Sequence, residues 1–220
     1  MAVANARYQF TAIDVGGYGR QGDGGTFAAW ALSKKLVNGT LNIPEPKEIV
    51  PGGEKMPHVF VADEAFPLTC NIMIPYAGSC LDKEKRIANY RLSRARRIVE
   101  NAFGILAARW QIFKRAIYYQ PIMVDNIVKA CVVLHNFLCT SREHTYKPAT
   151  FIDRELEDGQ IVNGEWRNEA SVAEMLTPLP RSSLPRQVPN KEAKRLRDAF
   201  KTYFNSNVGK VSWQDKAAFV

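Results

Sequence analysis

The amino-acid sequence predicts an α/β fold, in which short buried strands alternate with helices. A strand-like run, a helix-like run and a second strand-like run follow one another in the first third of the chain, an order typical of α/β layers. The apolar content of 46% in 220 residues is also sufficient for one core-bearing domain with appendages.

The first predicted strand covers residues 8–15, which are rich in aromatic and branched side chains. It runs into a glycine cluster at residues 16–25, which predicts a loop. Residues 26–37 then repeat apolar side chains at helical spacing and stop at Asn38 and Gly39.

A proline-rich connection separates this helix from the second predicted strand. Residues 38–57 contain four prolines, which indicates a loop, and the strand follows at residues 58–62. Asp63 stands just past the end of that strand.

The longest helical pattern covers residues 83–109. One sector of this helix carries apolar side chains and is expected to face the core. Its members are Ala88, Leu92, Ala95, Val99, Ala102, Phe103 and Leu106. Glu100 falls at the border between this stripe and the solvent side, where a carboxylate is held yet reachable.

Residues 122–138 are apolar on almost every side, which predicts a helix buried between layers. His135 and Asn136 within it are interpreted as structural groups. From residue 141 the chain is predicted to form an extended arm that ends in a short docked helix at 191–204, so the proposed division is 1–140 for the main domain and 141–220 for the arm.

Positive charge is concentrated in residues 83–115, which hold ten Lys or Arg and two acids, a balance of +8 that equals the net charge of the whole chain. A concentrated basic segment indicates a polyanionic partner, and DNA is the first to consider. Arg91, Arg94, Arg96 and Arg97 are the candidate DNA-binding residues.

The remaining composition excludes several classes of protein. The N-terminus has no apolar signal core, and the longest uninterrupted apolar run is short for a membrane span. The four cysteines lack the spacing of a zinc site or a disulfide scaffold. A basic chain in a reducing compartment, nucleus or cytoplasm, with no membrane partner, is expected.

Asp63 and Glu100 are a candidate carboxylate pair that an α/β layer would bring together. Two carboxylates at short distance repel unless a cation or proton lies between them, and Mg²⁺ or Mn²⁺ suits their oxygen ligands. The structural alternative is that Asp63 caps a loop and that Glu100 pairs with Arg96 or Arg97 at helical spacing.

Five motifs follow one another along the chain, at residues 14–27, 61–68, 75–76, 89–104 and 134–138. The last four resemble the second half of the nuclease domain of PIF/Harbinger-type transposases, and residues 14–27 resemble the segment that precedes it. The late stretches 164–167 and 203–214 also resemble the tail of some members.

This resemblance implies an Asp-Asp-Glu endonuclease with a ribonuclease H-like fold that cuts DNA with a divalent metal ion, Mg²⁺ or Mn²⁺. Asp63 then matches the second acid and Glu100 the third, as catalytic residues and metal ligands. The family usually works in the nucleus with a separate Myb-like DNA-binding partner.

The chain departs from the family pattern at the first acid, since no Asp-Gly-x-His-like motif precedes Asp63 on an early strand. An N-terminally shortened, partial fold is therefore expected, and catalytic activity of this chain is in doubt. Asp14 and Asp23 are the nearby acids that could substitute, although Asp23 is rather expected to cap the helix near Thr26.

Two alternatives to an active nuclease stay open. One is a domesticated protein that binds DNA or protein through the basic helix without performing chemistry. The other is a fragment that folds poorly alone, because missing strands would expose a sheet edge.

Overall fold

The structure is a computed structural model that describes residues 1–17, 22–168 and 190–219. Two compact units are present. One comprises Met1–Arg20 and Arg97–Pro180, and the other comprises Gln21–Arg96 and Arg181–Val220. We call them unit 1 and unit 2 and describe each by itself.

Unit 1 contains two small sheets and the second half of the long helix α3. Its elements are β1 (Ala2–Ala4), β2 (Phe10–Ile13), the C-terminal part of α3 (Lys83–Arg109), η2 (Gln111–Lys114), α4 (Pro121–Ser141), α5 (Glu143–Tyr146), η3 (Ala149–Phe151), β7 (Arg154–Glu155), β8 (Ile161–Val162) and η4 (Glu165–Asn168). β1 pairs antiparallel with β2, and β7 with β8.

Unit 2 contains the first half of α3 and the last part of the C-terminal arm, from Arg181 onward. Its other elements are α1 (Gly22–Ala29), α2 (Ala31–Val37), β3 (Lys47–Glu48), β4 (Lys55–Met56), β5 (Phe60–Val61), β6 (Ile72–Met73), α7 (Lys191–Asn205) and α8 (Gln214–Ala217). β3 pairs antiparallel with β4, whereas β5 and β6 are parallel.

Helices mixed with small sheets are consistent with the predicted α/β class. The predicted strands at 8–15 and 58–62 are found as the shorter β2 and β5. The helix expected at 26–37 begins earlier, at Gly22, and is split at Trp30, whose extended backbone (φ −65°, ψ 137°) separates α1 from α2. The loop predicted at 38–57 contains the short β3–β4 hairpin.

The helix predicted at 83–109 is confirmed with the same bounds. Its predicted core face is mostly confirmed, since Ala88, Leu92, Ala102 and Leu106 are buried. Ala95 is exposed instead. Ile105 and Ala108, outside the predicted stripe, are buried because the segment after α4 covers that side of the helix in unit 1.

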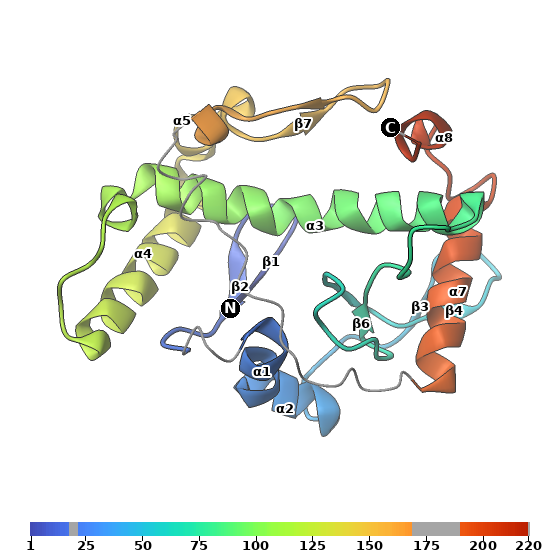
Figure 1. Cartoon of the computed structure of the whole chain (residues 1–220), viewed down its shortest axis with the longest axis horizontal. Coiled ribbons are helices and arrows are strands. Elements are labelled where there is room, and N and C mark those ends of the chain that lie inside the picture. The colour runs from blue at the N-terminus through green and yellow to red at the C-terminus, as the bar shows by residue number, and fades with distance from the viewer. Residues whose placement is uncertain (18–21, 169–189, 220) are drawn as a thin grey trace. The chain divides into compact units, whose positions relative to one another are not determined.

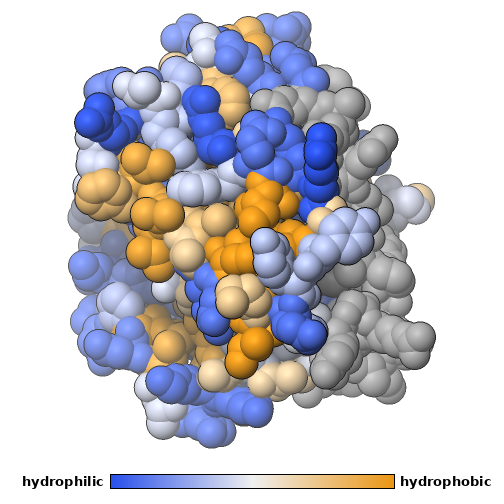
Figure 2. Space-filling view, turned by 90° about the vertical axis from the view of Figure 1, so that its left-hand side faces the viewer, coloured by the Kyte–Doolittle hydropathy of each residue, from blue (hydrophilic) through white to orange (hydrophobic). Residues whose placement is uncertain are grey.

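The interpretation of α4 as a helix buried all round is wrong. Its buried residues are Cys131, Val132, His135 and Cys139, which occupy one face. Figure 2 shows hydrophobic side chains gathered on the side of the molecule where α4 lies. The exposed ones in α4 and just before it are Tyr118, Tyr119, Ile122, Met123, Val133, Leu134 and Phe137.

By length and composition alone, α4 would suffice to cross a membrane, which the short uninterrupted apolar run did not indicate. One such helix is weak evidence, because a helix at the edge of a protein core meets the same criteria. The absence of a membrane partner stays a prediction.

His135 and Asn136 are structural, as predicted. His135 is fully buried, with its Nδ1 2.8 Å from the Tyr146 hydroxyl and its Nε2 2.8 Å from the Tyr8 carbonyl oxygen. Asn136 donates to the Phe10 carbonyl and accepts from the Phe10 N–H, both at 2.8 Å, as a neighbouring strand would. Burial lowers the pKa of His135, so the neutral ring is the favoured form.

The expected docking of the helix near residues 191–204 is seen within unit 2. Ala193 and Leu196 of α7 are buried in one cluster with Leu92 of α3 and Met73 of β6. Figure 1 shows α7 running crosswise to α3, near the N-terminal end of α3. The division of the chain at residue 140 stays a prediction.

Candidate functional site

Asp63 lies in unit 2, two residues after the end of β5. Its Oδ1 accepts a hydrogen bond of 2.8 Å from the backbone N–H of Ala65, which forms a tight turn. The side chain is half-buried. This turn supports the alternative in which Asp63 caps a loop. The hydrogen bond from Ala65 involves Oδ1 and does not involve Oδ2.

Asp23 is electrostatically close to Asp63 within the same unit. Partial burial raises the pKa of Asp23, and the negative charge of Asp63 raises it further. Asp23 does not cap a helix at Thr26, because α1 already begins at Gly22 and places Asp23 in its first turn. The other substitute acid, Asp14, belongs to unit 1, where its backbone pairs with that of Met1.

Glu100 lies in the part of α3 that belongs to unit 1, and 36% of its side chain is exposed. This agrees with its predicted place at the rim of the apolar stripe. Its Oε2 is 3.9 Å from Nη2 of Arg167 in η4, so a cation from the segment after α4 lies next to the Glu100 carboxylate. We call the segment from residue 142 to residue 168 the tail.

Arg91 and Arg94 contact the C-terminal arm in unit 2. Arg91 donates from Nη1 to the Gly209 carbonyl at 2.7 Å and to Oε1 of Gln214 at 3.1 Å. The guanidinium of Arg94 lies 5.3 Å from the ring centroid of Trp213. Both arginines therefore help to dock the arm, a role that sequence reasoning did not assign to them.

Arg96 and Arg97 are both partly buried on α3. Nη1 of Arg97 lies 3.8 Å from Oε2 of Glu155 in β7, and only 15% of the Arg97 side chain is exposed. DNA binding by the four predicted arginines stays a prediction, and the contacts of Arg91, Arg94 and Arg97 show that each also has a structural role.

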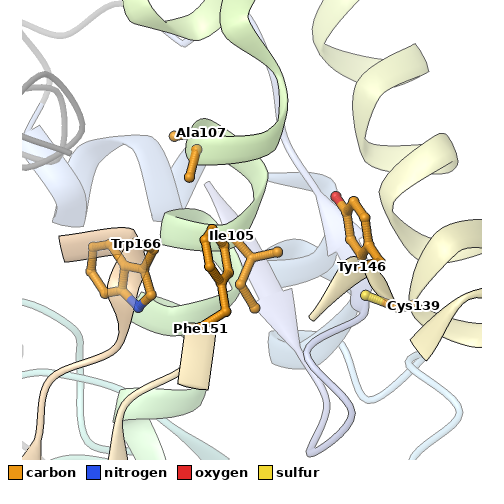
Figure 3. Close-up of a cluster of buried hydrophobic side chains, with 7 residues drawn as sticks. Ile105, Ala107, Cys139, Tyr146, Phe151 and Trp166 are labelled. Atoms are coloured by element: carbon orange, nitrogen blue, oxygen red, sulfur yellow. The ribbon is translucent and has the colours of Figure 1, made fainter. Parts of the chain in front are cut away.

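A polar cluster around Asn101 in unit 1 was missed by sequence reasoning. The Oδ1 of buried Asn101 accepts from Trp166 Nε1 at 2.8 Å and from the Asp153 N–H at 3.0 Å. Figure 3 shows Trp166 among the neighbouring core side chains Ile105 and Phe151. The resemblance of residues 164–167 to a family tail was the available signal.

The carboxylate pair cannot be assembled from one unit, since Asp63 belongs to unit 2 and Glu100 to unit 1. Their approach stays a prediction. Within residues 1–17, 22–168 and 190–219, no group of three or more His, Cys, Asp or Glu side chains could hold a metal ion. Asp63 and Glu100 have the oxygen donors that Mg²⁺ prefers, but the described residues do not complete a metal site.

The fold and these residues define an α/β protein with half-buried acids at a strand end and on a strongly basic helix. The family model described as DDE superfamily endonuclease matches residues 1–136, more than half of the chain, and the chain belongs to this family. No curated protein and no solved structure matched it.

Membership supports a transposase-like nuclease function with DNA as substrate. DDE endonucleases generally use divalent metal ions. The matched range includes Asp63, Glu100 and all four candidate arginines.

Proposed function

We propose that this chain is a transposase-derived DNA endonuclease domain of the PIF/Harbinger type, with a partial ribonuclease H-like fold. In this proposal Asp63 and Glu100 are the second and third acids of an Asp-Asp-Glu site, with Mg²⁺ or Mn²⁺ as cofactor. The observation that carries it is the family match over residues 1–136, a range that includes both acids.

The Asx turn at Asp63 makes a charge-specific test feasible. Asparagine keeps the Oδ1 acceptor for the Ala65 N–H and removes the negative charge alone. Asp158 forms the same kind of turn, since its Oδ1 accepts from the Gln160 N–H at 2.9 Å. Asp158→Asn is therefore a matched control for Asp63→Asn.

The test is cleavage of labelled duplex DNA carrying transposon ends, with Mg²⁺ or Mn²⁺, by the full-length protein encoded at the locus. Asp63→Asn and Glu100→Gln should each reduce the cleavage rate by at least a hundredfold, whereas Asp158→Asn should cleave normally. Full activity in both acid variants would remove Asp63 and Glu100 from the catalytic site.

The basic helix is proposed to bind the DNA backbone through Arg91, Arg94, Arg96 and Arg97. Each phosphate contact contributes about 0.9 to the slope of log K against log salt concentration. Arg96→Gln should lower that slope by about one in fluorescence anisotropy with duplex DNA. The exposed Lys129 of α4 provides a control, because Lys129→Gln removes the same charge outside the basic segment. Equal slopes in all three proteins would count against the basic helix as the interface.

A nuclear location and a Myb-like DNA-binding partner complete the proposal, both from the family resemblance. Co-purification of this chain from nuclear extract with a Myb-like protein encoded beside it would support the pairing. Recovery of the chain in the cytosolic fraction alone would contradict it.

The second candidate function is a non-catalytic DNA- or protein-binding protein. It is favoured by one observation, that no set of three metal-binding side chains occurs in the part of the chain the structure describes. Salt-dependent DNA binding that is unchanged in Asp63→Asn and Glu100→Gln, together with no cleavage by the natural protein, would select this function.

A further inference from the structure

Arg167 of η4 lies beside the proposed third acid within unit 1. Its Nη2 is 3.9 Å from Oε2 of Glu100, and about one third of each side chain is exposed. The two residues are 67 positions apart in sequence, so this approach depends on how the tail folds back onto α3.

Arg167 is held firmly by a buried carboxylate. The Asp153 side chain is fully buried, and it accepts from Arg167 Nε at 2.9 and 3.0 Å and from Nη2 at 2.6 Å. Asp153 Oδ1 also accepts from the Gly164 N–H at 2.8 Å. Because such a two-pronged guanidinium–carboxylate pair has defined geometry, the position of the Arg167 charge is fixed.

The segment that carries Arg167 is anchored on the same helix as Glu100. Asn101, the residue after Glu100, bonds to both Trp166 and Asp153. Gly104, one turn further, leaves room for the Trp166 ring. The Arg167 guanidinium and the Glu100 carboxylate are therefore both held by α3, which fixes the distance between them.

The two contacts of Arg167 differ in strength. Hydrogen-bond distances join it to Asp153, whereas the 3.9 Å to Glu100 is an ion pair without a short hydrogen bond. Asp153 therefore binds the guanidinium, and the charge remains available to Glu100.

We propose that Arg167 is a positioning residue for Glu100, a fixed internal cation that neutralises this carboxylate and competes there with a divalent metal ion. The inference rests on the proposed function, in which Glu100 is a metal ligand. It gives the segment after α4 a role at this site, because that segment supplies the charge that a metal ion at Glu100 would have to displace.

The test measures Mn²⁺ affinity by the electron paramagnetic resonance signal of free Mn²⁺, with the whole chain and without DNA. An exposed ion pair is worth up to about 1 kcal/mol, so Arg167→Gln should bind Mn²⁺ about two- to fivefold more tightly than the natural chain. Glu100→Gln should lose this binding, and the double variant should resemble Glu100→Gln.

Two further variants separate positioning from structural damage. Trp166→Phe removes one hydrogen bond to Asn101 but keeps every charge and the bond from the Asp153 N–H to Asn101, so its Mn²⁺ affinity should equal that of the natural chain. Arg167→Lys keeps a cation for Asp153 but loses the planar guanidinium group that reaches both Asp153 and Glu100, so this variant should bind Mn²⁺ more tightly than the natural chain. It keeps the test available if Arg167→Gln fails to fold. A purely structural role would weaken Mn²⁺ binding in these variants.

The outcomes distinguish the two proposals. Mn²⁺ binding that is lost in Glu100→Gln but unchanged or weaker in Arg167→Gln and Arg167→Lys would overturn the role of Arg167 alone. No Mn²⁺ binding by the natural chain or any variant would overturn the metal-ligand role of Glu100, and with it the role of Arg167.

Discussion

Gly104 in the middle of α3 should be unusually intolerant of alanine. Alanine normally favours a helix by about 1 kcal/mol over glycine, so the default expectation is stabilisation. At this position, however, a Cβ would lie 2.6 Å from Cε2 of Trp166, and still closer to Cε3 and Cδ2. The substitution must therefore displace an indole that is only 2% exposed.

The magnitude follows from two costs. Overpacking a filled core costs about 1–3 kcal/mol. Displacing the ring also breaks the Trp166–Asn101 hydrogen bond, and a buried polar group left unpaired costs about 1–3 kcal/mol. After the helix-propensity gain of about 1 kcal/mol is subtracted, Gly104→Ala should lower the free energy of unfolding by about 1–5 kcal/mol.

Thermal unfolding followed by circular dichroism provides the measurement. For a chain of this size 1 kcal/mol corresponds to about 2–4 °C, so the Tm of Gly104→Ala should fall by about 2–20 °C. Gly24 of α1 is the control, because a Cβ there would meet only the Ala65 carbonyl oxygen at an ordinary 3.6 Å. Gly24→Ala should raise the Tm slightly. An unchanged or higher Tm in Gly104→Ala, with unaltered tryptophan fluorescence, would refute the packing of Trp166 against α3.

Three further predictions follow from the titrating groups. Because burial lowers the folded-state pKa of His135 below 6.5, the unfolded chain binds more protons, so the stability from this residue is present above pH 6.5 and lost as the pH falls. In urea unfolding, the free energy of unfolding should fall less between pH 7.5 and pH 5.5 for His135→Gln than for the natural chain. Asp153→Asn breaks a pair in which the carboxylate is fully buried and Arg167 partly exposed, so it should cost about 3 kcal/mol of unfolding free energy in urea. The pKa of Asp23 is raised in the folded chain by burial and by the charge of Asp63, so the charged form of Asp23 opposes folding above that pKa. Asp23→Asn should therefore raise the urea midpoint of unfolding at pH 7. A lower midpoint would show that Asp23 has a stabilising partner.

The long helix was predictable from sequence because it depends on local order. Apolar residues at helical spacing over residues 83–109 indicate a helix without information from any other part of the chain, and the observed bounds are the same. The place of Asp63 just after a strand follows equally from a short branched run that ends before it.

The exposure of α4 was not predictable in the same way. Apolar residues on almost every side indicate burial only if neighbours cover every side, and the pattern contains no information about those neighbours. Val133 and Phe137 are 66% and 64% exposed in the chain as described, whereas His135 between them is fully buried. Tertiary contacts decided which face was covered.

The contacts that the segment after α4 makes around Glu100 were beyond sequence reasoning because they are long-range. Asp153 and Trp166 are 52 and 65 residues from Asn101, and no periodic pattern links an acid in an irregular segment to a helix so distant. Local spacing suggested Arg96 or Arg97 as the partner of Glu100, and that pairing stays a prediction. The ion pair with Arg167 shows how folding supplies a partner that helical spacing does not indicate.

The hairpin formed by β7 and β8 is closed at its base by the bond between the Asp153 carboxylate and the Gly164 N–H. Because both ends are tied together there, the length of the hairpin does not set the position of the residues that follow it. Its tip, at Asp158 and Gly159, is therefore a suitable place to insert a short peptide tag or attach a fluorophore. A reporter at that point could follow the tail in a living cell while Arg167 stays beside Glu100.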